Sequence, residues 1–168
     1  MSDFRIRPQN RDGDLEAIKA INQAAFGKGG GTAAFQALRV AGDPDILSLV
    51  AEQAGEIVGH VFFSPVTVES EPPLAGMGLG ELAVLPDWQR RGVGRALTEA
   101  GCRALTEVDC PYAIVIGLPA YYPKLGFEPG DQHGLRCQWE VPAESFMVRI
   151  LAAPGLNGAT GVARYRDV

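Results

Sequence analysis

Apolar residues alternate with polar ones, or form unbroken runs, in several segments of the first half of the chain, and these patterns predict strands. The segments are 3–8, 46–52, 57–68 and 77–85. Ala54-Gly55-Glu56 separates the second segment from the third as a tight turn, which predicts a β-hairpin. The run at 77–85 stops at Pro86 and adds a further antiparallel strand to that hairpin.

Apolar residues at helical spacing predict three helices. The segments are 15–26, 32–41 and 87–110. The segment Asp12-Gly13-Asp14 offers the N-cap of the first helix, and Thr32 is the expected cap of the second. The third helix starts at Asp87 and carries Leu97 and Val108 on its apolar side. The glycine-rich run 27–31 predicts either a plain linker or a mobile loop that admits substrate.

The rest of the chain adds a buried strand and several short elements. Residues 112–118 are almost wholly apolar, which is typical of a central strand buried on both faces. A short helical or turn segment follows at 119–126, and 127–168 holds short strands, including one over 145–151. A strand, helix and strand inside an antiparallel pattern predict a mixed α/β fold with about six to seven strands and about four helices. The length of 168 residues predicts a single domain over 1–168.

Charge and cysteine content exclude several classes of protein. Lys and Arg number 15 against 20 Asp and Glu, a net charge of −5, so nucleic acid is not an expected partner. No apolar run reaches the ~18–20 residues of a membrane span, and the start has no apolar signal core, so a cytoplasmic protein is expected. The three cysteines are scattered and only two histidines are present, so no metal site is expected.

The start of the third predicted helix breaks the rules for an isolated helix. Gly92 and Gly94 each cost ~1 kcal/mol relative to alanine. Arg90, Arg91 and Arg95 stand at the helix end that already carries about half a positive charge. A bound anion explains both choices, because glycines let a phosphate approach backbone N–H groups and arginines neutralise its charge. A solvated basic turn at the surface is the alternative.

The pattern of these glycines narrows the kind of anion. Gly92-Val93-Gly94 lacks the third glycine of a dinucleotide fingerprint, and the chain has no Gly-Lys-Ser or Gly-Lys-Thr of a Walker loop. The segment instead resembles the pyrophosphate-binding signature of the GNAT superfamily of N-acetyltransferases. Gln89, Gly92 and Gly94 match that signature residue by residue.

A second motif downstream supports the resemblance. The segment from Tyr122 to Phe127 resembles the Tyr-x-x-x-Gly-Phe element that follows the fifth strand of the family. The chain is also similar to the small bacterial YhbS-like predicted acetyltransferases, most strongly over 80–127. The resemblance implies a GNAT-like fold, a mostly antiparallel twisted sheet in which strands four and five are splayed.

The resemblance further implies an acetyl-CoA-dependent N-acetyltransferase that uses no metal. In this family the glycine-arginine segment holds the pyrophosphate of acetyl-CoA, and the backbone at the end of strand four binds the pantetheine arm. The cofactor-binding residues that it implies are Leu82, Ala83, Val84, Gln89, Arg90, Arg91, Gly92, Val93, Gly94, Arg95 and Tyr121.

Two residues are the expected catalytic groups. Tyr122 is the expected general acid, since the family commonly uses the tyrosine at this spacing to protonate the departing thiolate. Tyr121 is its close competitor, and packing of either ring is the structural alternative. Glu81 is the expected acceptor of the amine proton, directly or through water, and an ordinary ion pair with an arginine explains it equally well. His60, in the middle of a strand, is expected to be a hydrogen-bonded core imidazole outside the site.

The acceptor amine stays open from the sequence. A small metabolite, an antibiotic-like amine, a peptide N-terminus and a protein lysine all fit. Two alternatives to the N-acetyltransferase also remain: a non-catalytic acyl-CoA-binding regulatory module, and a transferase with another acyl-CoA donor. A homodimer is a further expectation, because dimers are common among similar proteins.

Overall fold

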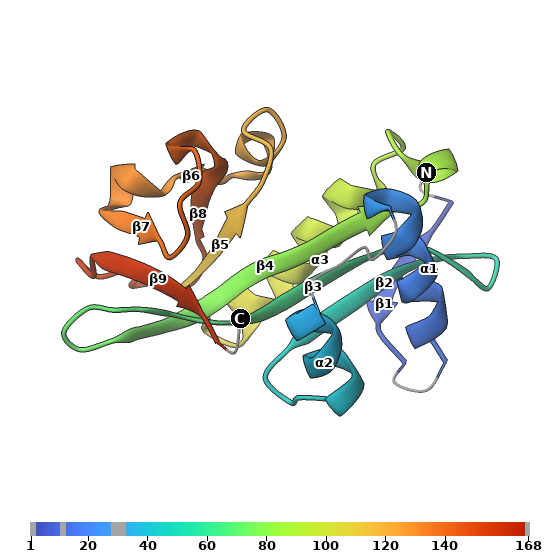
Figure 1. Cartoon of the computed structure of the whole chain (residues 1–168), viewed down its shortest axis with the longest axis horizontal. Helices are drawn as coiled ribbons and strands as arrows, with labels where there is room; N and C mark the ends of the chain where they lie inside the picture. Colours follow the sequence, from blue (N-terminus) through green and yellow to red (C-terminus); the bar gives the residue numbers. More distant parts are fainter. Residues whose placement is uncertain (1–2, 11–12, 28–32, 167–168) are drawn as a thin grey trace. The chain divides into compact units, whose positions relative to one another are not determined.

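The computed structural model describes residues 3–10, 13–27 and 33–166, which form two compact units. The first unit comprises Met1–Phe63 and Gly80–Gly101, and the second comprises Ser64–Leu79 and Cys102–Val168. Three elements have residues in both units: β3 (Glu56–Val68), β4 (Leu74–Val84) and α3 (Val93–Glu107). Figure 1 labels these elements along the chain. The predicted loop at 28–31 and the predicted cap Thr32 lie outside the described residues.

The first unit contains the predicted N-terminal strand and hairpin. β1 (Arg5–Pro8) pairs antiparallel with β2 (Leu47–Gln53), and β2 pairs antiparallel with β3. β4 follows β3 in the order of the sheet, and within this unit the Leu85 amide donates to the Val58 carbonyl over 2.8 Å. The predicted hairpin is therefore confirmed, but its turn comprises only Ala54 and Gly55, because Glu56 pairs with Gln53 as the first residue of β3.

Helices cover both faces of β3 in this unit. Adjacent strand residues point to opposite faces. The ring of Phe62 packs against Phe35 of α2 (Ala33–Ala41), with the ring centres 5.2 Å apart. Its neighbour Phe63 lies against α3, where a Cβ on Gly101 would come within 2.4 Å of the Phe63 ring. The two helices thus pack on opposite faces of the strand, and Gly101 is needed for the close approach of α3.

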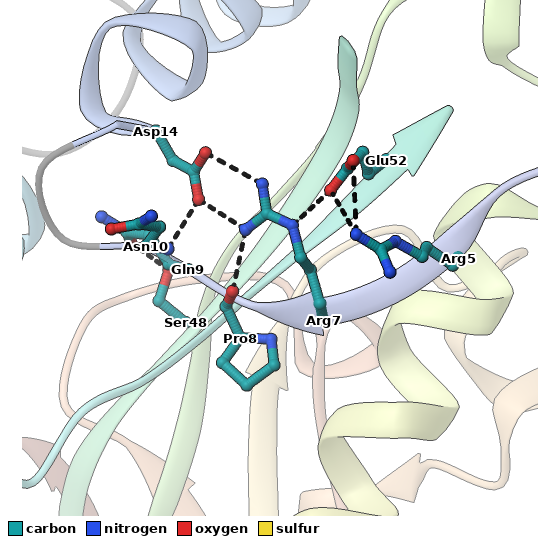
Figure 2. A network of polar contacts seen from close by, with 8 residues as sticks. All are labelled: Arg5, Arg7, Pro8, Gln9, Asn10, Asp14, Ser48 and Glu52. Atoms are coloured by element: carbon teal, nitrogen blue, oxygen red, sulfur yellow. Dashed lines mark hydrogen bonds and ion pairs between the residues drawn. The ribbon is translucent and has the colours of Figure 1, made fainter. Parts of the chain in front are cut away.

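An ion-pair network ties β1 to the start of α1 (Leu15–Phe26) and to β2 (Figure 2). The Arg7 guanidinium donates to both carboxylate oxygens of Asp14, over 2.7 and 3.1 Å, and also to Glu52. The backbone N–H of Asn10 also donates to the Asp14 carboxylate, over 2.6 Å. Asp14 is the N-cap residue of α1, within the predicted capping segment, but its side chain makes no cap hydrogen bond with the helix. Arg7 and the Asn10 backbone bind this side chain instead.

We expect Arg7→Met to lower the free energy of unfolding by about 2 kcal/mol at pH 7, since hydrogen bonds to charged groups are broken. Arg7 lowers the pKa of Asp14 below its usual 3.8 and that of Glu52 below its usual 4.5. Such a stabilisation is complete above pH 5 and disappears as the pH falls through and below 4. Urea unfolding at pH 7 and pH 3 measures both effects.

Arg5→Met is the matched control for this prediction. The Arg5 side chain is 73% exposed and lies 3.4 Å from Glu52, so solvent screens this ion pair and its contribution to stability is small. An equal loss in Arg5→Met and Arg7→Met, or a difference as large at pH 3 as at pH 7, would contradict the stabilising role of the Arg7 bonds.

The second unit contains the parallel pair of strands. β4 pairs parallel with β5 (Tyr112–Ile116) over Met77–Leu79, and β5 pairs antiparallel with β8 (Phe146–Ile150). β8 also pairs antiparallel with β6 (Glu128–Pro129). The end of β3 pairs antiparallel with β9 (Gly161–Tyr165). β9 in turn pairs parallel with β7 (Leu135–Cys137). The predicted strand, helix and strand in a mostly antiparallel sheet are confirmed as β4, α3 and β5.

Three glycines at alternate positions of β4 make room for aromatic rings. A Cβ on Gly76 would lie 2.4 Å from the Tyr112 ring, and one on Gly78 would lie 2.4 Å from the Tyr165 ring. In the first unit, a Cβ on Gly80 would lie 2.6 Å from Phe35. The two tyrosine hydroxyls donate back to β4 carbonyls, over 2.8 Å to Leu74 and 2.9 Å to Leu79. The glycines of β4 are therefore a packing requirement.

Several predicted boundaries differ from the structure. α3 begins at Val93 and not at Asp87, and Val108 lies beyond its end with 72% of its surface exposed. β5 ends at Ile116, so Leu118 is exposed and not part of a buried strand. The described residues form nine strands and three α-helices, against the predicted six to seven strands and four helices. The short strands β6 and β7 account for the additional strands, and the segment 122–125 is a 3-10 turn. In the described part of the chain, no helix combines the length and apolarity that crossing a membrane requires.

Candidate active site

The connection between β4 and α3 is a tight, irregular loop. A 3-10 turn, η1 (Pro86–Trp88), follows β4, and the side chain of Gln89 donates to the Val84 carbonyl over 3.1 Å. Arg90 and Gly92 have positive φ angles, +63° and +85°. Because left-handed residues interrupt a right-handed helix, α3 cannot begin before Val93. The predicted start at Asp87 fails for this reason.

The first turn of α3 presents backbone N–H groups and cations together. The amides of the first turn have no acceptor within the helix, and the helix dipole places partial positive charge there. Arg90, Arg91, Gly92 and Arg95 are exposed at this end. A Cβ on Gly92 would meet nothing within 4 Å, so the space beside its backbone is open. The loop thus has the donors, charge and access that an anionic group requires.

Packing beneath this loop fixes its position in the first unit. Val93 is buried, and its side chain lies over β3, where a Cβ on Gly59 would come within 3.1 Å of it. Leu97, one turn later, packs on the same glycine. On the outer side, the Arg91 guanidinium lies over the Trp88 ring, 4.9 Å from its centre. Val93 therefore anchors the helix start, while its arginine neighbours stay exposed.

The end of β4 alternates between buried and half-buried residues. Glu81 and Ala83 are buried, whereas Leu82 and Val84 are half-buried, so the first two share one face of the strand. The register between β4 and β5 covers Met77–Leu79, and β4 continues to Val84. Residues 82–84 thus follow, along β4, three residues that are in register with β5.

The Glu81 carboxylate is part of a buried polar cluster in the first unit. Arg39 of α2 donates to it over 3.2 Å, and Asn22 of α1 donates to the same oxygen over 3.5 Å. His60 of β3 contacts both partners: its Nε2 lies 2.6 Å from the Asn22 oxygen, and its Nδ1 lies 3.5 Å from Arg39. All four side chains are at most 4% exposed. Glu81 thus forms the arginine ion pair that the sequence left as an alternative to a catalytic role.

Burial, together with the smaller effect of the nearby Arg39 cation, lowers the pKa of His60 to about 3. The imidazole is therefore neutral at physiological pH and is hydrogen-bonded in the core, as the sequence analysis expects of it. It does not serve as a base near pH 7.

Tyr121 and Tyr122 belong to the second unit. Tyr122 starts the 3-10 turn η2 (Tyr122–Leu125), and its ring packs edge-on against Tyr121 and Phe127, with centres 5.0 and 5.6 Å apart. A Cβ on Gly117 would lie 2.3 Å from the Tyr122 ring, so that position requires glycine. Burial raises the pKa of the Tyr122 hydroxyl, which therefore stays protonated throughout the neutral range. Tyr122 can therefore act as a proton donor. Its neighbour Tyr121 is less buried than Tyr122.

Sequence reasoning did not place Asn22 and Arg39 near Glu81. Arg39 offered one signal: it lies four residues after Phe35, on the buried face of α2. A charged residue on the apolar face of a helix requires a buried partner of opposite charge. The identity of that partner carried no signal, because Glu81 lies 42 residues away along the chain.

The described residues contain no group of three or more His, Cys, Asp or Glu side chains arranged to hold a metal ion. Of the three cysteines, Cys102 is buried, and Cys110 and Cys137 are half-buried.

Comparisons with known proteins agree on one family. A family model of the acetyltransferase (GNAT) domain matches residues 44–129. YhbS of Escherichia coli K12, an uncharacterized N-acetyltransferase, is 38% identical over 122 residues, which are 72% of each chain. The crystal structure of Escherichia coli YhbS in complex with CoA matches with a TM-score of 0.86 and 32% identity, over 99% of this chain and 91% of that one. A GNAT family acetyltransferase from Brucella melitensis in complex with acetyl-CoA matches with a TM-score of 0.75 and 27% identity, over 97% and 96% of the two chains.

Proposed function

The chain belongs to the GNAT family of acetyltransferases, and from this premise we propose that it transfers the acetyl group of acetyl-CoA directly to a primary amine. The observation that carries the proposal is the loop at 89–95, which combines open glycine backbone, a helix N-terminus and exposed arginines. The CoA and acetyl-CoA complexes of the two similar structures agree with it. Both compact units contribute to a single acetyltransferase domain in this proposal, since the family match at 44–129 includes residues of each.

The cofactor-binding part of the proposal follows from the chemistry of the loop. The amides of Gly92 to Arg95 donate to the pyrophosphate oxygens, and Arg90, Arg91 and Arg95 offset the negative charge. Gln89 keeps the loop closed through its bond to Val84. The backbone of Leu82, Ala83 and Val84 pairs with the pantetheine arm as an added strand would. Tyr121 packs against the bound cofactor.

The catalytic part of the proposal assigns one proton transfer to each of two residues. The Glu81 carboxylate accepts the proton that the amine loses when it attacks the thioester, directly or through one water. The Tyr122 hydroxyl donates a proton to the departing thiolate, and its burial keeps that proton in place at neutral pH. A backbone amide of residues 82–84 receives the thioester oxygen as negative charge develops on it.

The acceptor and the setting complete the proposal. We expect a primary amine, and we leave its class to a panel of small amines, peptides with a free N-terminus and lysine-containing peptides. We expect a cytoplasmic location. The acyl-CoA-binding regulatory module and another acyl-CoA donor remain the competing functions, and both keep the same pyrophosphate site.

We expect calorimetric titration of the purified protein to give micromolar binding of acetyl-CoA and CoA and no binding of NAD. NAD carries a pyrophosphate but no pantetheine arm, so it controls for unspecific anion binding. Release of free thiol across the amine panel then measures transfer, with succinyl-CoA as the control donor. Binding without transfer to any amine would favour the regulatory module, and the absence of CoA binding would contradict the proposed function altogether.

A further inference from the structure

The four buried polar side chains around Glu81 form a closed ring of hydrogen bonds. The ring joins four separate elements of the first unit: α1 through Asn22, α2 through Arg39, β3 through His60 and β4 through Glu81. The side chains of Arg39 and Glu81 are 1% and 3% exposed, so their ion pair is shielded from water. Burying a polar group costs free energy unless the group is hydrogen-bonded. Removal of any one of the four side chains would therefore leave its neighbours in the ring without a hydrogen-bond partner.

The chemistry of the partners fixes the direction of each bond. A guanidinium only donates, so Nδ1 of His60 must be an acceptor and Nε2 must carry the proton of the neutral ring. Nε2 then donates to the Asn22 carbonyl oxygen, which turns the Asn22 amide nitrogen toward Glu81. Arg39 donates to Glu81 directly. Both paths from Arg39 therefore end at the same carboxylate oxygen of Glu81.

This convergence defines what the ring does. Two donors on one oxygen, Oε1, restrict the rotation of the Glu81 carboxylate. Arg39 is itself held by the Phe62 ring, whose centre lies 4.6 Å from the guanidinium carbon. We propose that Asn22, Arg39 and His60 are positioning residues that fix the Glu81 carboxylate for acetyl transfer, an inference that rests on the proposed role of Glu81.

The ring itself can be tested without any activity. Nitrogen chemical shifts of His60 in the purified protein report its tautomer and charge between pH 5 and pH 8. We expect the neutral ring with the proton on Nε2 across this range, because the pKa of His60 is lowered to about 3. A proton on Nδ1, or titration of His60 between pH 5 and pH 8, would contradict the ring and overturn the inference.

The positioning role is tested by turnover of the best amine in the panel. We expect Arg39→Met to lower kcat by at least tenfold, while KM for acetyl-CoA and its Kd change by less than twofold. Arg39→Lys keeps a cation and should recover part of kcat. Arg7→Met is the matched control for lost stability, because it breaks an ion-pair network of the same unit that takes no part in the proposed chemistry. It should lower Tm and leave kcat unchanged.

His60→Gln keeps the inference testable if Arg39→Met does not fold, since it removes no charge from the core. We expect kcat to fall about fivefold with acetyl-CoA binding retained. Unchanged kcat in a folded Arg39→Met or His60→Gln would reduce the ring to a structural role and overturn the inference alone. Lack of transfer by the parent protein would instead overturn the proposed function, and with it the positioning role.

Discussion

Gly92→Glu is expected to abolish measurable binding of acetyl-CoA. The new carboxylate would stand among Arg90, Arg91 and Arg95, in the open space beside the Gly92 backbone. The carboxylate would repel the pyrophosphate. It would also form ion pairs with the arginines that otherwise offset the charge of the pyrophosphate. We expect affinity to fall at least about a hundredfold, which corresponds to about 3 kcal/mol. Calorimetric titration with acetyl-CoA measures the loss directly.

Gly55→Glu is the matched control for this prediction. Gly55 has a φ of +84°, against +85° for Gly92, and a Cβ at either position would meet nothing within 4 Å. Both substitutions therefore carry the same backbone strain, about 1–2 kcal/mol for a residue forced into the left-handed region. Gly55 lies in the turn between β2 and β3, outside the candidate site. Full acetyl-CoA binding by Gly92→Glu, or equal losses in the two variants, would refute the assignment of the loop.

Tyr122→Phe should lower kcat by about a hundredfold and leave the Kd of acetyl-CoA unchanged. The substitution removes only the hydroxyl, so the ring keeps its packing against Phe127 and beside Gly117. Because burial raises the pKa of Tyr122, its hydroxyl does not titrate between pH 6 and pH 9. The ratio of the parent and variant rates should therefore stay constant over that range. Steady-state thiol release at several pH values measures both kcat and the ratio.

Tyr121→Phe is the control for the loss of a neighbouring hydroxyl. Tyr121 is half-buried and its ring lies 5.0 Å from that of Tyr122, so the two variants change adjacent groups in the same segment. We expect at most a twofold change in kcat. A large loss in Tyr121→Phe with normal turnover in Tyr122→Phe would exchange the two roles, and normal turnover in both would remove the tyrosine pair from the chemistry.

Local patterns in the sequence predicted most elements of the fold. The alternation in the β2–β3 hairpin and the apolar β5 follow from short-range rules, and both are present in the structure. The start of α3 could not be predicted from periodicity, because Arg90 adopts a left-handed conformation that is unusual for a residue with a side chain. The resemblance to a family identified the loop, but only the backbone angles explain why the helix begins after it.

The surroundings of Glu81 could not be predicted from the sequence for a different reason. Asn22, Arg39 and His60 come from three elements, and Asn22 and Glu81 are separated by 59 positions. Contacts between distant elements depend on the final packing, so no spacing rule describes them. The buried position of Arg39 after Phe35 was the one local indication that a charged partner had to exist.

The alternate glycines of β4 have a consequence for how the chain reaches its folded state. Glycine loses more backbone freedom on folding than any other residue, so an isolated β4 has little tendency to become extended. Its support comes from rings on α2, β5 and β9, and those of β5 and β9 follow it in the sequence. Contacts between distant segments form late, because the intervening chain must first be closed into a loop. We therefore expect β4 to be ordered after the β2–β3 hairpin during refolding. Tyr112→Phe and Tyr165→Phe, which remove only the hydroxyl bonds to β4, should then show low φ-values.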